Sequence, residues 1–177
     1  MDESDIPAAP PTSLKHRLSW ATVSWWITHA DRTLTEEIPA PPDQVRDFYV
    51  DLDSIKVVHP LVVSVQTISR SESADGYQQT YRVRDRIPLG RLAIRISYWA
   101  RIQVPVHGAV ITEARQFPLV RLRGSVTFEP IDSGTRLSER LRIAAPRPLA
   151  AMTQREAVNA HVAMLAGIRS HFEPSDQ

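Results

Sequence analysis

Apolar and polar side chains alternate along most of this chain, a pattern typical of strands that bury one face. The first alternating segment is Arg32–Ile38. After it, Pro42 opens a segment with apolar residues at helical spacing, where proline is tolerated in the first turn. A second helical piece, Asp51–Val58, ends at His59-Pro60, because a residue before proline disfavours the helical conformation. We therefore predict one strand followed by two short helices.

The middle of the chain is predicted to be a run of strands. In the longest segment, the even-numbered residues from Leu92 to Val106 form one apolar face. Asp132-Ser133-Gly134 has the composition of a tight hairpin turn. With no helical pattern between them, these segments predict an antiparallel sheet. The predicted strands are Leu61–Ser69, Tyr77–Ile87, Leu92–Val106, Ala109–Gln116, Val120–Glu129 and Thr135–Ala144.

A single long helix is predicted to close the chain after Pro146 and Pro148. Its apolar residues recur every three or four positions and define one face: Val158, Val162, Leu165, Ile168 and Phe172. The order of elements predicts an α+β fold in which a curved antiparallel sheet of about six to seven strands wraps around the long C-terminal helix.

Outside this domain the pattern changes. Residues 1–13 are rich in proline, acidic and small residues and predict a disordered tail, and residues 174–177 form a short polar tail. Residues 14–30 form an extension that contains Trp20, Trp25 and Trp26, three of the four tryptophans. This extension either packs against the domain or contacts a membrane or protein partner, since tryptophan beside basic residues suits a membrane interface. The domain itself is assigned to residues 31–173.

Composition excludes several classes. The 21 basic and 20 acidic residues nearly balance, so charge gives no indication of nucleic-acid binding. Cysteine is absent, which excludes disulfides and thiolate metal sites and fits a cytoplasmic location, with peripheral membrane contact left open. No apolar run is long enough to span a membrane. No histidine pair has metal-ligand spacing and no nucleotide-binding motif occurs, so we expect neither a metal nor a cofactor.

The order of elements resembles the START-like, polyketide cyclase–dehydrase and lipid-transport (SRPBCC) superfamily. The similarity covers Arg32–Phe172 and is carried by the segments IPAPPDQVRDFYVDLDSI and HPLVVSVQTI, the hairpin between Phe128 and Leu137, and the closing helix. It implies the helix-grip fold, with a mostly apolar cavity between sheet and helix. The superfamily contains lipid and sterol carriers, hormone receptors and aromatase/cyclases, so the fold by itself selects no function.

Glu139 is the sharpest candidate for a functional residue. It shares the inward face of Leu137 and Leu141, where a carboxylate is costly unless it is paired, protonated or in contact with a ligand. If it is paired, we expect an arginine as the partner. His161, on the inner side of the final helix, is a candidate general base or a histidine whose hydrogen bonds are satisfied by the protein. The residues predicted to line the cavity are Tyr81, Asp85, Tyr98, Glu139, His161 and Leu165.

Three functions remain open at this level. The first is binding, transport or sensing of a hydrophobic molecule such as a lipid, a sterol-like compound or an aromatic polyketide. The second is a cyclase, aromatase or dehydratase in which Glu139 or His161 moves protons. The third is an interaction module that uses the tryptophan-rich extension. Arginines on outward strand positions favour a solvated face, with an anionic lipid or acidic partner as the alternative: Arg82, Arg84, Arg86, Arg91, Arg95 and Arg101. The sequence leaves the ligand and the oligomeric state open.

Overall fold

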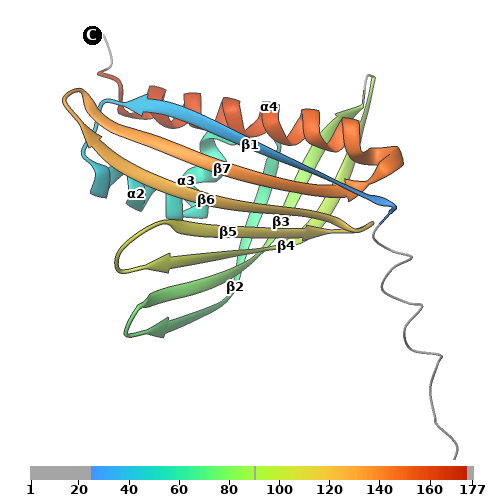
Figure 1. The fold of residues 1–177 in the computed structure, drawn as a ribbon, viewed down its shortest axis with the longest axis horizontal. Helices are drawn as coiled ribbons and strands as arrows, with labels where there is room; N and C mark the ends of the chain where they lie inside the picture. Colours follow the sequence, from blue (N-terminus) through green and yellow to red (C-terminus); the bar gives the residue numbers. More distant parts are fainter. Residues whose placement is uncertain (1–24, 90, 175–177) are drawn as a thin grey trace, which may run out of the picture.

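The computed structural model describes residues 25–89 and 91–174, and these form one antiparallel sheet with three helices (Figure 1). The elements in chain order are β1 (Ile27–Ile38), α2 (Pro42–Val50), α3 (Leu52–Val58), β2 (Val62–Ser73), β3 (Gly76–Leu89), β4 (Leu92–Pro105), β5 (Val110–Gln116), β6 (Val120–Ile131), β7 (Gly134–Pro146) and α4 (Arg147–Phe172). The seven strands lie in the order β1-β7-β6-β5-β4-β3-β2, so every neighbouring pair except β1 and β7 is consecutive along the chain.

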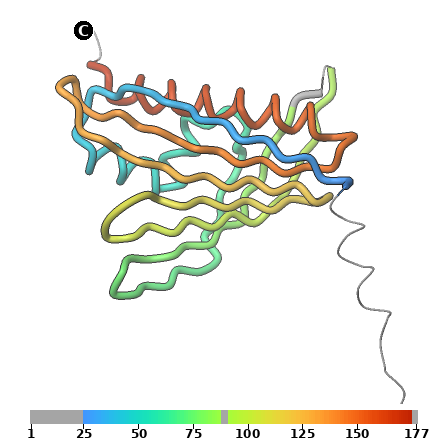
Figure 2. Tube along the Cα trace, in the orientation of Figure 1, coloured from blue at the N-terminus to red at the C-terminus, as the bar shows by residue number. Residues whose placement is uncertain are grey.

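The helix-grip fold predicted from the order of elements is confirmed. The curved sheet embraces α4, which packs against β1, β7 and α3 (Figures 1 and 2). Two short helices follow the first strand, as predicted. No helix in the described part of the chain is both long enough and apolar enough to cross a membrane.

The two halves of α4 bury side chains of different size. In the N-terminal half the buried residues are the alanines Ala150, Ala157 and Ala160, whereas the C-terminal half buries Met164, Leu165 and Ile168. The large residues pack with α2, α3 and the sheet in the main hydrophobic core. Small residues cannot fill the space between a helix and a concave sheet, so the N-terminal half of α4 leaves room for a cavity.

Three local expectations differ from the structure. The first strand begins at Ile27, because the end of the tryptophan-rich extension continues the ladder with β7, where Ile27 pairs with Pro146. Val162 is exposed, because it lies on the outer side of α4. Leu92 is exposed as well, because the first residues of β4 extend beyond the helix and are covered by nothing in the described chain.

The β6–β7 hairpin packs closely against the backbone that connects β1 to α2. Gly134 adopts a φ of 135°, which favours glycine, and a Cβ atom there would lie 2.2 Å from the carbonyl oxygen of Ile38. The next residue, Thr135, is fully buried and donates a hydrogen bond from Oγ1 to the carbonyl oxygen of Ala40 at 2.6 Å. The hairpin therefore fixes the connection between β1 and α2.

We expect Gly134→Ala to lower the free energy of unfolding by about 2 kcal/mol or more, because backbone strain and a steric clash act together. Gly108→Ala is the matched control: Gly108 also has a positive φ, of 93°, but a Cβ atom there would meet nothing within 4 Å. In the control, Gly108→Ala, the free energy of unfolding should fall by only about 1 kcal/mol. Urea unfolding of both variants measures the difference, and equal losses would contradict the packing role of Gly134.

Candidate functional site

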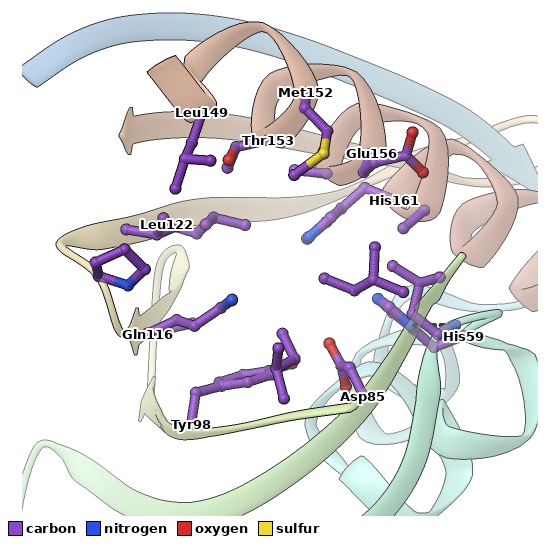
Figure 3. A pocket seen from close by; sticks show the side chains of 18 residues that line it. His59, Asp85, Tyr98, Gln116, Leu122, Leu149, Met152, Thr153, Glu156 and His161 are labelled. Atoms are coloured by element: carbon purple, nitrogen blue, oxygen red, sulfur yellow. Dashed lines mark hydrogen bonds between the residues drawn. The ribbon is translucent and has the colours of Figure 1, made fainter. Parts of the chain in front are cut away.

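A cavity lies between the concave face of the sheet and the N-terminal half of α4. It consists of two adjoining lobes of about 140 and 130 Å³, which share the lining residues His59, Tyr98, Ala114, Leu122 and His161. Figure 3 shows the first lobe, with His59, Asp85, Tyr98 and His161 around it. The remaining wall is mostly apolar: Leu61, Ile87, Ile96, Pro118, Val120, Leu149, Met152, Ala157 and Ala160. Such a lining suits an apolar ligand oriented by a few polar groups.

Glu139 and His161 form a buried pair between β7 and α4. Alternation along β7 buries Leu137, Glu139 and Leu141 on one face, so Glu139 has no exposure to solvent. One carboxylate oxygen, Oε2, lies 2.9 Å from Nδ1 of His161. The other, Oε1, accepts a hydrogen bond from the hydroxyl of Tyr49 at 3.0 Å. Both oxygens of the buried carboxylate are therefore satisfied by side chains from two other elements.

Room for this carboxylate is made by a glycine on β6. A Cβ atom at Gly124 would lie 3.2 Å from Oε1 of Glu139 and 2.3 Å from Oγ1 of Thr112. Any larger residue would displace one of these groups. Gly124 thus holds open the space in which Glu139 meets its partners.

The pair is electrostatically coupled. Burial alone would raise the pKa of Glu139, but the charge of His161 and the hydrogen bonds from His161 and Tyr49 lower the pKa below its ordinary value. Burial likewise works to lower the pKa of His161, yet the charge and hydrogen bond of Glu139 raise it above its ordinary value. The favoured state is a carboxylate facing an imidazolium. Because Nδ1 faces Glu139, Nε2 is the ring nitrogen left for the cavity, into which His161 points (Figure 3).

His59 lies across the cavity from this pair. Its ring centroid is 6.0 Å from that of His161, and the two rings are nearly perpendicular, at 82°. Burial and the charge of His161 lower the pKa of His59 to about 4, so the ring is neutral near pH 7. Its Nδ1 accepts a hydrogen bond from the backbone N–H of Leu61 at 3.3 Å.

Asp85 is the second buried carboxyl group of the cavity. It is on β3, and burial raises its pKa to about 6, against the opposing effect of a hydrogen bond with Tyr98. Among the described residues, its Oδ1 has no hydrogen-bond partner. A buried oxygen without a partner beside a cavity is a natural acceptor for a ligand donor.

The predicted cavity residues fall into three groups. Asp85, Tyr98 and His161 line the cavity. Glu139 lines neither lobe but is hydrogen-bonded to two residues that do, His161 and Tyr49. Tyr81 and Leu165 line neither lobe, because both are buried in the main core.

Sequence reasoning also missed two members of the site and one pairing. From the sequence, His59 is interpreted only as the end of a helix before proline. It is the C-cap residue of α3, and its side chain also lines the cavity. Tyr49 read as an apolar position of α2. The expected arginine partner of Glu139 was wrong, since His161 and Tyr49 take that place. Only three-dimensional contacts across distant elements reveal these roles.

The remaining candidates lie elsewhere. Trp25 and Trp26 are exposed before β1, with ring centroids 4.6 Å apart, whereas Trp20 lies outside the described residues. The six arginines expected on outward strand positions are all exposed. Within residues 25–89 and 91–174, no group of three or more histidine and acidic side chains is arranged to hold a metal ion.

Comparison with solved structures shows the same fold in proteins of distant sequence. TTHA0849 from Thermus thermophilus has 19% identity and a TM-score of 0.60, with 82% of this chain and 96% of that chain covered. The Zhui aromatase/cyclase from Streptomyces sp. R1128 has 16% identity and a TM-score of 0.60, with 82% and 93% covered. Ara h 8.0201 has 11% identity and a TM-score of 0.56, with 82% and 97% covered.

Comparison of the amino-acid sequence identifies the family to which the chain belongs. No protein of curated function matches it. The sequence profile of the family described as polyketide cyclase / dehydrase and lipid transport, however, matches residues 29–173. This range runs from β1 to the end of α4 and contains every residue of the cavity described above. Because the match spans most of its length, the chain belongs to the polyketide cyclase/dehydrase and lipid transport family.

Proposed function

We propose that this protein binds a hydrophobic, carbonyl-bearing small molecule in the cavity under α4, and that His161, oriented by Glu139, moves a proton on it. The reaction class is cyclisation or dehydration. An enzyme is therefore favoured over a carrier, although the sequence alone favours a carrier.

The observation that carries the proposal is the Glu139–His161 pair. A fully buried carboxylate costs several kcal/mol of desolvation, and apolar residues of similar size would stabilise the fold at least as well. The pair instead fixes the imidazole by its Nδ1 and leaves Nε2 to the cavity. A carboxylate that sets the orientation and tautomer of a histidine is the arrangement used by acid–base catalysts.

The direction of the pKa shift assigns the first step. Because Glu139 raises the pKa of His161 above its ordinary value, the pair favours the protonated ring, which can act first as a general acid. Nε2–H can donate to a ligand carbonyl oxygen during carbon–carbon bond formation, or to a hydroxyl group that leaves as water. In dehydration, the neutral imidazole then accepts the proton lost from the carbon next to the carbonyl. In cyclisation, it accepts the hydroxyl proton that the attacking enol loses as its carbonyl re-forms, and either transfer restores the protonated ring.

Apolar walls supply binding energy and polar groups supply orientation. Burial of the ligand's apolar surface contributes about 25 cal/mol per Å² before the costs of association. Asp85 offers an acceptor without a protein partner, and the Tyr98 hydroxyl lies beside it. A ligand with a hydroxyl or enol group near one end would satisfy Asp85 while its carbonyl faces His161.

Carriage without turnover is the second candidate function. The mostly apolar lining favours it, because binding alone requires no proton transfer. Under this alternative, the Glu139–His161 pair would serve only to hold α4 on the sheet.

Replacing Glu139 separates the two functions. We expect Glu139→Gln to lower the rate of dehydration of an aromatic β-hydroxy ketone by about 10²–10⁴-fold, because the histidine loses its orienting charge. Formation of the conjugated enone is followed by ultraviolet absorbance. Binding of anilinonaphthalene sulfonate, measured by fluorescence, should stay within a factor of about three, because the apolar walls are unchanged.

Glu156→Gln is the matched control, since Glu156 also lines the cavity but pairs with Arg155 at 3.1 Å. It should keep its activity. If the wild-type protein binds the dye but does not accelerate dehydration, the enzyme proposal fails and carriage is favoured. If Glu139→Gln and Glu156→Gln lose activity equally, Glu139 has no special role in the reaction.

Asp85 should make stability depend on pH in a recognisable way. Burial raises its pKa from 3.8 to about 6, so the folded state holds the proton more tightly than the unfolded state. Stability from this group is therefore fully present below the unfolded pKa and is lost as pH rises from 3.8 to about 6. We expect Asp85→Asn to stabilise the protein near pH 7 by on the order of 2–3 kcal/mol, with the gain vanishing below about pH 4.

Urea unfolding at several pH values measures this effect. Asp132→Asn, in the exposed turn between β6 and β7, is the control and should change stability little at any pH. A destabilising Asp85→Asn near pH 7 would mean that the ionised carboxylate has a partner in solution, contrary to the unsatisfied oxygen described above.

A further inference from the structure

Large apolar side chains are exposed at one end of the sheet, around the outer part of the first cavity lobe. Phe117, in the β5–β6 connection, is 89% exposed and Leu119 beside it is 55% exposed. Leu92 and Ile94, at the start of β4, are 76% and 48% exposed. Their near neighbours along the chain, Ile96 and Pro118, line the lobe, so this surface is continuous with the cavity wall.

The exposure has a topological cause. The ladder between β4 and β5 starts at Trp99 and Arg115, so Leu92–Tyr98 have no partner on β5. The β3–β4 hairpin therefore projects past the end of β5, and its tip rises above the N-terminal turns of α4 (Figure 1). Alternation keeps Leu92 and Ile94 on the cavity side of the hairpin, but none of the three helices in the described part of the chain covers them.

Two tryptophans lie at the same end. The carbonyl oxygen of Trp26 accepts a hydrogen bond from the backbone N–H of Arg147, the first residue of α4, at 2.8 Å. Trp25 and Trp26 are both exposed there. Tryptophan is enriched where a protein meets the polar–apolar boundary of a bilayer. We call the combined surface the apolar rim; its members are Trp25, Trp26, Leu92, Ile94, Phe117 and Leu119.

Exposed arginines lie near the apolar rim, on the outer face of the hairpin and on the neighbouring elements. Arg84, Arg86, Arg91 and Arg95 are all exposed on the hairpin, and its only acidic residue, Asp85, is buried. Arg115 and Arg121 flank the β5–β6 connection and Arg147 opens α4, and all three are exposed. The nearest acidic group on β5, Glu113, lies 4.0 Å from Arg115 and 3.6 Å from Arg123. The whole chain is nearly neutral, so this end is positive by arrangement rather than by composition.

We propose that the apolar rim docks on an anionic membrane surface and that apolar molecules pass between the bilayer and the cavity at this point. Large apolar side chains at separate loop and hairpin tips, with arginines set behind them, match a surface that is apolar inside and anionic outside. A single acidic protein would match the arginines but leave the separated apolar tips without a common pocket. The docking surface does not involve the Glu139–His161 pair, so it stands or falls independently of the proposed proton chemistry.

Vesicle sedimentation of the full chain tests the proposal. Wild-type protein should bind phosphatidylcholine vesicles that contain phosphatidylglycerol, bind pure phosphatidylcholine weakly, and release as salt is raised. Arg95→Glu should weaken binding to the anionic vesicles about tenfold, because reversal of one charge near the surface removes attraction and adds repulsion. Phe117→Ser should weaken it by a similar factor, because it removes an inserted apolar side chain.

Each variant has a matched control away from the apolar rim. Val106→Ser removes a 53% exposed apolar residue just after the opposite end of β4, and Arg140→Glu reverses an exposed arginine in the middle of β7. Both should bind like the wild type. The proposal is overturned if the wild type does not bind anionic vesicles. It is also overturned if Phe117→Ser and Arg95→Glu bind anionic vesicles as strongly as their controls do. It is also overturned if Arg95→Glu abolishes capture of an acidic protein while vesicle binding is absent.

Discussion

The site of this protein depends on one buried ion pair between its last strand and its last helix. Glu139 and His161 meet 2.9 Å apart, and neither could remain charged under the helix without the other. Removal of one partner from such a pair typically costs about 3–5 kcal/mol, because the remaining charge is left unpaired in an apolar environment. The pair therefore ties the position of α4 to the same atoms that give the cavity its reactive nitrogen, so that stability and chemistry share one contact.

The size of the side chains along α4 determines where the helix packs in the core and where it leaves a cavity. Ala157 and Ala160 face the first lobe, Met164 lines the second lobe, and Leu165 and Ile168 complete the core about one to two turns further on. The helix itself is continuous, and so is the curvature of the sheet (Figure 2). A change from small to large residues at a few helical positions would thus exchange cavity for core without any change of fold.

Most of the fold could be predicted from the sequence, because strand alternation and helical spacing are local signals. The same signals placed Glu139 on the inward face of β7 and His161 on the inner side of the helix. They could not identify the partner of Glu139, which depends on how α4 and α2 lie on the sheet. Alternation also tells which face a side chain is on, but not whether another element covers that face, which is why Leu92 is exposed against expectation.

The order of strands has a consequence for how the molecule assembles. Strands β2 to β7 are joined by successive local turns, but the ladder between β1 and β7 connects residues that are distant in sequence, such as Thr35 and Ser138, which are 103 positions apart. Loop-closure entropy disfavours such a contact until the meander between them has formed. Both the docking of β1 and the covering of the cavity by α4 are therefore late events in folding. Until then, the concave apolar face of the sheet is open to water, and this is the stage at which the chain is most prone to aggregate.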